Sequence, residues 1–530
     1  MSWSDQIGFP VLTVITFLPL AGVIAILLFG RGKPQVYKVI SLVVTLAAFV
    51  LSAWTLFVFK VKLPGMQFAE SLDWIAPLNI KYGMGVDGIA LLLVFLTTLL
   101  GVVVIVASWH YVKDREMGFF ISLLLLEVGM VGVFCATDLF LFYVFWEAML
   151  IPMYFIIGIW GGPRRIYAAI KFFLFTLVGS LLMLLAIIVV VYYVRDQTGV
   201  LTFDIQALST MVYSYNLQYW AFLAFFVAFA IKVPMFPVHT WLPDAHVEAP
   251  TAGSVILAGV LLKMGGYGML RFCLPFFPDA AVTFIPWVVG LSVVAIVYGA
   301  LVAMMQKDLK KLVAYSSVSH MGFVTAGIFA GIALVGNAAG VEGAILVMLS
   351  HGFLTGALFL MVGFLYERTH TRLIADMGSL AKPLPILAGF LLFFAFGSAG
   401  LPGLSGFVGE FLSLFGLFEY SRWMAAVAAL GVILAAAYLL WMFQRTMFND
   451  RGDDEVKPSF GLKDLGVREI TSLVPLVVFV IWLGVYPQTF LEFLHVPVQV
   501  ILDRVTPSLN DTSAGMGALA QLVDSVRGLF

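Results

Sequence analysis

Long runs of apolar residues, separated by short polar segments, follow one another along most of this chain. A helix needs about 20 apolar residues to cross the ~30 Å hydrocarbon core of a bilayer. Counted on that basis, the pattern predicts about 14 membrane-spanning helices. Their expected ranges are 9–29, 38–59, 86–109, 117–136, 139–160, 168–194, 218–239, 250–272, 282–305, 312–333, 340–366, 385–416, 424–447 and 470–490.

The composition agrees with a chain that lies almost wholly in a membrane. Of its 530 residues, 62% are hydrophobic and 11% are charged, whereas soluble domains carry about 25% charged residues. The net charge of -1 provides no basic face for nucleic acid. The two cysteines, Cys135 and Cys273, form no CxxC pair, so we expect them to hold neither an iron–sulfur cluster nor zinc. The fold class expected is an all-α integral membrane protein.

The basic residues predict the orientation of the helices. Most of the 29 lysines and arginines fall in the loops that follow odd-numbered helices, and such basic loops remain in the cytoplasm. With an even number of spans, both termini lie on one side of the membrane. We therefore expect both termini on the outer side.

Two predicted spans contain residues that interrupt a helix. In 218–239, Lys232-Val233-Pro234 is followed by Pro237, and proline disfavours helical geometry in the residue before it. In 385–416, residues 397–409 read GSAGLPGLSGFVG, a sequence of low helix propensity. We predict a broken helix at each position, with simple kinks that improve packing as the alternative.

The spacing of the two breaks suggests an internal repeat. They lie five helices apart, so helices 4–8 and 9–13 are expected to be two copies of one unit, the second inverted, as in many ion-coupled transporters. The expected divisions are 1–115 for helices 1–3, 116–272 for the first five-helix half-channel, 273–448 for the inverted second one, and 449–530 for helix 14 and a C-terminal tail.

Ionisable side chains fall near the middle of six predicted spans, where each costs about 2.5–3.5 kcal/mol to insert. These residues are Glu147, Lys232, Lys263, His320, His351 and Glu410, and the set is extended by Glu127 and Lys171. Because neighbouring helices pack about 8–10 Å apart, such groups form a row whose gaps one or two waters bridge. The set predicts a proton or ion path, and ion pairs that merely fix helix register are the alternative.

Lysine suits a proton path for a physical reason. Burial and a neighbouring carboxylate act on the pKa of a lysine in opposite directions, so moving the partner switches its affinity for a proton. Glu147 is the expected partner of Lys232.

The histidines leave further interpretations open. His320 and His351 are expected at depth, one per helix, which disfavours a bis-histidine haem site. The nearby lysines favour a relay role for them, with hydrogen-bonded packing residues as the alternative. Four polar residues are expected to cluster in the loop after the seventh span: His239, Asp244, His246 and Glu248. Proton uptake from the cytoplasmic side, loop capping and a weak metal site are the alternatives there.

One apparent motif is rejected. Gly83, Gly85 and Gly88 spell GxGxxG, but we expect no preceding strand and no βαβ unit around them, and a membrane span follows at once. The glycines are therefore not expected to bind a dinucleotide.

Several segments resemble a known family, the antiporter-like membrane subunits of respiratory complex I with the related Mrp antiporters and membrane hydrogenases. The most specific is FAIKVPMFPVHTWLPDAHVEAPTAGS at residues 229–254. Others are ATDLFLFYVFWEAMLIPM at 136–153, KDLKKLVAYSSVSHMG at 307–322 and LPGLSGFVGEF at 401–411. Within the family, YGMGVDGIAL at 82–91 and a glutamate at 410, where sister subunits usually have lysine, are most similar to chain M.

The resemblance implies roles for the buried charges. Glu147 and Lys232 would form the coupled pair of a first half-channel, and Glu410 the terminal site of a second. Lys263, His320 and His351 would form the polar axis between them, while the resemblance assigns no role to Glu127 and Lys171.

The resemblance also implies an assembly. The chain would be a proton-translocating subunit without a cofactor or redox site of its own, beside sister antiporter-like chains. Partner subunits would hold FMN and iron–sulfur clusters, oxidise NADH and reduce quinone. An Mrp-type sodium/proton antiporter, an energy-converting hydrogenase and a structural scaffold are the alternatives. Composition favours a bacterial inner membrane over a mitochondrial one.

Overall fold

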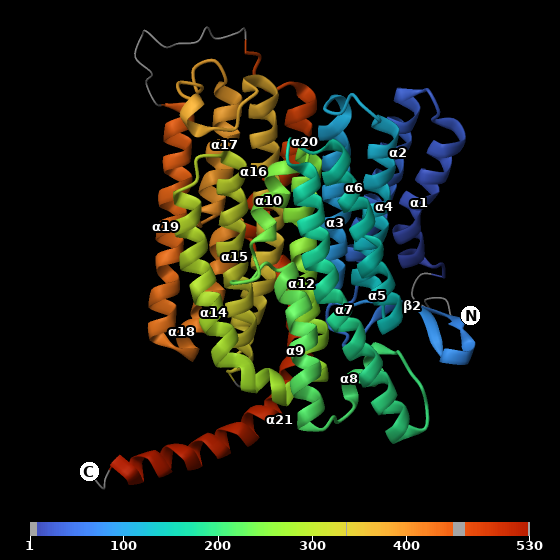
Figure 1. Cartoon of the computed structure of the whole chain (residues 1–530), viewed down its shortest axis with the longest axis vertical. Coiled ribbons are helices and arrows are strands. Elements are labelled where there is room, and N and C mark those ends of the chain that lie inside the picture. Colours follow the sequence, from blue (N-terminus) through green and yellow to red (C-terminus); the bar gives the residue numbers. More distant parts are fainter. Residues whose placement is uncertain (1–7, 335–336, 449–461, 528–530) are drawn as a thin grey trace.

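The computed structural model describes residues 8–334, 337–448 and 462–527, with side chains described as far as residue 510. The helices run side by side in one bundle, and the C-terminal helix leaves the bundle at its lower end (Figure 1). The segment 449–461, which the sequence assigns to the last division of the chain, lies outside the described residues.

Twelve helical segments in the described part of the chain are long and apolar enough to cross a membrane, and they coincide with twelve of the predicted spans. The continuous ones are α1 (Val11–Phe29), α2 (Pro34–Val58), α3 (Gly88–Ala107), α4 (Glu116–Cys135), α7 (Arg165–Thr198), α14 (Pro278–Met304), α15 (Leu309–Ile332), α16 (Ala339–Thr369), α19 (Arg422–Met447) and α20 (Val467–Val485). These helices confirm the all-α membrane fold.

The other two of the twelve are composite. One is α5 (Leu139–Ala148), which continues directly into α6 (Leu150–Trp160). In the other, α11 (Thr251–Ile256), α12 (Leu262–Gly268) and α13 (Leu274–Phe276) are joined by π-helical turns at Leu257–Leu261 and Met269–Cys273. π-Helical turns inside a helix are uncommon and frequently occur at functional sites.

The remaining two predicted spans are broken, as their prolines and glycines predict. Span 218–239 becomes α9 (Tyr215–Lys232) and α10 (Trp241–Glu248), and span 385–416 becomes α17 (Pro385–Ser398) and α18 (Ser405–Tyr420). At the second break, Gly400 and Gly403 have φ angles of 79° and 89°, which glycine adopts without steric cost. The total of 14 crossings and the inverted repeat stay predictions.

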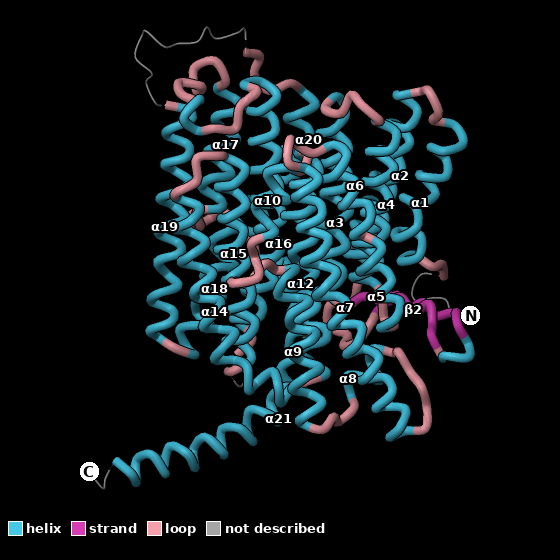
Figure 2. Tube along the Cα trace, in the orientation of Figure 1, coloured by secondary structure: helices cyan, strands magenta, loops and turns pink. Residues whose placement is uncertain are grey.

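A two-stranded hairpin precedes α3, and the hydropathy pattern did not predict it (Figure 2). Strand β1 (Gln67–Ile75) pairs antiparallel with β2 (Ile80–Val86). Because Gly83 and Gly85 lie in β2, the expectation that no strand precedes the glycine motif was wrong. The hairpin is the only sheet in the described residues, and a Cβ at Gly83 would lie 2.6 Å from the Thr137 hydroxyl. The glycines therefore serve close packing.

The C-terminal segment is helical, not an irregular tail. Helix α21 (Gln488–Arg527) follows α20, and its beginning lies directly on α3, since a Cβ at Gly88 would lie 1.8 Å from the carbonyl oxygen of Phe493. Two proline residues, Pro497 and Pro507, lie inside this helix. A short helix, α8 (Ile205–Thr210), lies between α7 and α9.

The innermost helices are α11–α13, α15 and α16. The most apolar windows of α11–α13 and α16 are entirely buried, and that of α15 is 94% buried. Two glycines bring the first π-helical turn and α16 close together, because a Cβ at Gly352 would lie 3.1 Å from the carbonyl oxygen of Gly259. By contrast, α2 and α19 expose large apolar side chains, Phe57 and Trp423 among them. Ionisable residues on the inner helices are therefore shielded from the bundle surface.

Candidate functional site

The inner helices bring Lys263 and His351 into direct contact. Lys263 lies on α12 and His351 on α16, and the Lys263 ammonium nitrogen is 2.7 Å from Nδ1 of His351. The ammonium also donates to the carbonyl of Ala258, which lies in the first π-helical turn. Both side chains are buried. The sequence had predicted a gap bridged by water at this point, and the structure shows a direct contact.

His320 and Glu410 form a second buried pair, between α15 and α18. His320 Nδ1 lies 2.6 Å from Oε1 of Glu410. An ionised carboxylate only accepts hydrogen bonds, so with Glu410 charged the Nδ1 hydrogen is donated to it. Nε2 of His320 then faces the hydroxyls of Ser398 and Tyr438, at 3.3 and 3.5 Å. The second oxygen of Glu410 has no hydrogen-bond partner in the described residues.

A short gap separates the two pairs. The ring centroids of His320 and His351 are 6.0 Å apart, and Nε2 of His351 has no hydrogen-bond partner among the described residues. Both rings line a cavity of about 10 Å³, together with Ser350 and Glu410. A cavity of this size, with imidazole, hydroxyl and carboxylate groups in its lining, has room for about one water. One water there would join Lys263, His351, His320 and Glu410 into a continuous row.

Glu147 and Lys232 lie apart from this row. Lys232 is the last residue of α9, where the negative end of the helix dipole favours a cation. Its ammonium is 5.1 Å from the Trp146 ring centroid and 5.9 Å from that of Phe172. Glu147 interacts with it electrostatically, but the described residues offer the ammonium no hydrogen bond. The predicted pair is therefore close without direct contact.

The break between α9 and α10 is stabilised around Lys232. The indole of Trp241 donates to the carbonyl of Ile231 at 2.9 Å, which satisfies an acceptor at the end of α9. Helix α12 packs tightly here, since a Cβ at Gly265 would lie 2.6 Å from the carbonyl oxygen of Phe229. Helices α9 and α12, which carry Lys232 and Lys263, are thus adjacent, although no hydrogen bond joins the two ammonium groups in the part of the chain that is described.

The two additional candidates have different surroundings. Glu127 on α4 is buried against Gly101, where a Cβ would lie 2.9 Å from its carboxylate, and its Oε1 has no hydrogen-bond partner within the described ranges. Lys171 on α7 forms an ion pair with Asp244 at 2.7 Å. Lys171 therefore fits the register-fixing interpretation, whereas Glu127 forms no such pair with any residue that the structure describes.

The prediction that the four polar residues after the seventh span cluster in a loop was wrong. Asp244, His246 and Glu248 lie on helix α10, because the chain resumes a helix after the break, and His239 lies just before it. His239 and His246 are both buried. The described residues contain no group of three or more His, Cys, Asp or Glu arranged to hold a metal. Instead, Arg164 lies 3.9 Å from Asp244 and 3.7 Å from Glu248.

Sequence reasoning missed Lys310, Ser398 and Tyr438. Lys310 was counted among the basic loop residues, but it lies in the first turn of α15 with only 4% of its surface exposed. Its position next to Lys311 in a charged stretch concealed this burial. Ser398 and Tyr438 face His320 from neighbouring helices, and no pattern in the sequence marks such partners.

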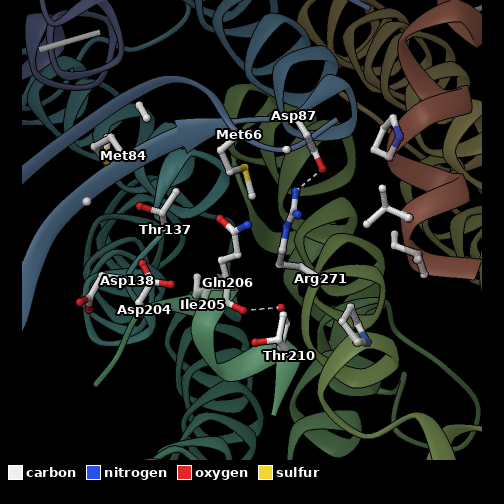
Figure 3. A pocket seen from close by; sticks show the side chains of 18 of the residues that line it. Met66, Met84, Asp87, Thr137, Asp138, Asp204, Ile205, Gln206, Thr210 and Arg271 are labelled. Atoms are coloured by element: carbon white, nitrogen blue, oxygen red, sulfur yellow. Dashed lines mark hydrogen bonds and ion pairs between the residues drawn. The ribbon is translucent and has the colours of Figure 1, made fainter. Parts of the chain in front are cut away.

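A separate pocket lies elsewhere, between the hairpin, α8 and α21. It has a volume of about 600 Å³. Figure 3 shows the ion pair between Arg271 and Asp87 on one side of it, with Asp138 and Asp204 on the other. Asp138 accepts from the backbone of Lys81 at 3.0 Å, and burial raises its pKa. None of the row from Lys263 to Glu410 lines this pocket.

Comparison with known proteins identifies what the chain is similar to. A sequence model described as NADH:quinone oxidoreductase/Mrp antiporter, transmembrane, matches residues 136–435. The NADH-quinone oxidoreductase subunit M of Rhodobacter capsulatus is 48% identical over 526 residues, which cover 96% of this chain and 98% of that protein. The NADH-ubiquinone oxidoreductase chain 4 of Marchantia polymorpha is 46% identical, covering 93% and 97%.

A solved structure shows the same similarity in three dimensions. A chain of respiratory complex I from Thermus thermophilus with bound NADH aligns with a TM-score of 0.83 at 33% sequence identity. The alignment covers 93% of this chain and 99% of that chain. Most of the bundle is thus shared, and residues 136–435, which the sequence model matches, contain every residue of the row.

Proposed function

Because this chain belongs to the NADH:quinone oxidoreductase/Mrp antiporter family, we propose that it translocates protons as the chain M subunit of an NADH:quinone oxidoreductase. The observation that carries the proposal is the pair of direct contacts, Lys263 to His351 and His320 to Glu410, in the interior of an apolar bundle. Burying four ionisable groups on four helices is costly, and such groups in membranes mark proton and ion pathways.

The chemistry of the row suggests how a proton moves. Lys232 and Lys263 each carry a proton as an ammonium and release it as a neutral amine. Each histidine accepts a proton at one ring nitrogen and releases one from the other. Glu410, with one unpaired oxygen, is the terminal site from which the proton leaves.

Glu147 regulates how tightly Lys232 holds its proton. Its distance from Lys232 determines how tightly that lysine holds its proton, since an opposite charge favours the charged form. We propose that rearrangement in the quinone-reacting partners shifts Glu147 relative to Lys232 and so drives proton release along the row. His239 and His246, with Glu127 and Lys171, are secondary candidates for the path.

The assembly follows from the family. Partner subunits would hold FMN, the iron–sulfur clusters and the quinone site, while this chain would hold no cofactor and perform no redox step. Sister antiporter-like chains would lie beside it in a bacterial inner membrane, with both termini on the periplasmic side. The ranges 116–272 and 273–448 would be two inverted half-channels. The similarity to bacterial subunit M and the distribution of basic residues support this arrangement.

The assembly is tested by gentle extraction and native electrophoresis. We expect the chain to migrate in a large band that stains for NADH-linked reductase activity, with the expected partner subunits identified by mass spectrometry. A smaller band without NADH activity would contradict the proposal. It would favour the sodium/proton antiporter branch, and nickel–iron subunits in the band would favour a hydrogenase.

The coupling is tested by Lys232→Ala. Removing the amine should reduce NADH-driven proton uptake into inside-out vesicles by about 10²-fold or more, the usual cost of losing a proton-transfer group. Lys62→Ala, at an exposed lysine, is the control and should pump normally. Wild-type pumping by Lys232→Ala in an intact complex would refute the mechanism.

A further inference from the structure

A second set of buried ionisable groups lies between the row and one end of the bundle. Lys310, in the first turn of α15, donates from its ammonium to the carbonyl of Ala249 at 2.6 Å. Ala249 follows directly after α10, the helix that carries His246. The Lys310 side chain therefore reaches inward from α15 to the end of the broken helix.

A cavity lies on the outer side of Lys310. Its volume is about 640 Å³, and its lining includes Glu248, Asp308 and Arg372, the same three charged residues that interact electrostatically with Lys310. Residues 163–164 and 305–308, from loops rich in basic residues, also line it. The cavity is open to solvent, and charged side chains that interact with Lys310 line it.

His246 lies on the inner side of Lys310. Its ring is completely buried and stacks on Phe359 of α16, with the ring centroids 4.4 Å apart. Neither ring nitrogen has a hydrogen-bond partner in the described residues. The ring interacts electrostatically with both Lys310 and Lys263. A buried imidazole with two unpaired nitrogens is rare unless water or a transient partner satisfies it.

We propose that Lys310 and His246 form a proton-uptake relay, which carries protons from the cavity bordered by Glu248, Asp308 and Arg372 to Lys263. This inference rests on the proposed function and adds Lys310 as a proton-carrying residue. The amine of Lys310 takes a proton from water in the cavity and passes it to one nitrogen of His246. The imidazole releases a proton from its other nitrogen to the neutral amine of Lys263.

A structural role for Lys310 makes a different prediction. If the ammonium only holds the end of α10 through Ala249, arginine will replace it, because guanidinium also donates to a carbonyl and faces the same carboxylates. Arginine does not release its proton in proteins. Lys310→Arg therefore separates the two roles.

The test uses the intact complex in inside-out vesicles, with NADH-driven proton uptake measured against NADH oxidation. We expect Lys310→Arg, Lys310→Met and His246→Gln each to lower uptake at least about tenfold, since losing a proton-transfer group costs ~10²–10⁴-fold. Lys311→Arg and Lys311→Met, at the next residue, which also lines the cavity, are the controls and should pump normally.

Wild-type uptake by Lys310→Arg would overturn the relay and leave Lys310 a structural residue. If either Lys310 variant fails to assemble, His246→Gln decides in the same assay, and its normal uptake would also overturn the relay. Failure of the proposed function is distinguishable, because Lys263→Met would then pump normally as well. If Lys263→Met loses uptake while Lys310→Arg and His246→Gln pump normally, the row remains the proposed proton path and only this route into it is refuted.

Discussion

Replacing Lys263 with methionine should abolish NADH-driven proton uptake while the complex still assembles. The side chain lies at the centre of the bundle and contacts His351 directly, so its loss removes a carrier that no neighbouring group replaces. We expect a decrease of at least about 10²-fold, in the range found when a proton-transfer group is removed. The measurement is dye-reported acidification of inside-out vesicles during NADH oxidation by quinone. The amounts of complex are first matched by their rates of NADH oxidation with an artificial acceptor.

Methionine is chosen because it resembles lysine in length and is readily buried. Leaving His351 Nδ1 and the Ala258 carbonyl without a partner should cost about 1–3 kcal/mol for each, so uptake is compared only after native electrophoresis has shown that the complex assembles. Lys33→Met, at an exposed lysine, is the control. If Lys263→Met pumps at the wild-type rate in an intact complex, the central row is not the proton path.

The sequence predicted the spans because a bilayer imposes a simple rule on length and hydropathy. The two breaks were equally predictable, since Pro234 and the glycines from Gly397 to Gly409 act on the local backbone. The row of charges stood out for the same reason: an ionisable group inside an apolar run is expensive wherever it lies. These are local signals that a single sequence contains.

The sequence alone could not predict which faces of the helices contact one another. The contact between Lys263 and His351 depends on the close approach of Gly259 and Gly352, which are separated by 93 positions in the chain. Lys310 was misjudged because its burial comes from α10 folding over it, not from its own charged surroundings. The hairpin was missed because its alternating polar residues resemble a loop when no partner strand is known.

Glutamine in place of Glu410 should also stop proton translocation, for a reason that separates proton carrying from hydrogen bonding. The amide oxygen of glutamine can still accept from Nδ1 of His320, so the buried contact between α15 and α18 is retained. The amide cannot take up or release a proton. We therefore expect normal assembly and a loss of proton uptake of about 10²-fold or more, measured as for Lys263.

Glu410→Ala gives the necessary contrast, because it leaves Nδ1 of the buried His320 without its acceptor. Breaking a buried charged pair costs about 3–5 kcal/mol, so this variant should assemble poorly as well as fail to pump. Glu419→Gln, at an exposed glutamate on the same helix, should behave like the wild type. Normal uptake by Glu410→Gln would mean that the proton leaves the row at His320, whose Nε2 faces Ser398 and Tyr438, and Glu410 would then only orient the imidazole.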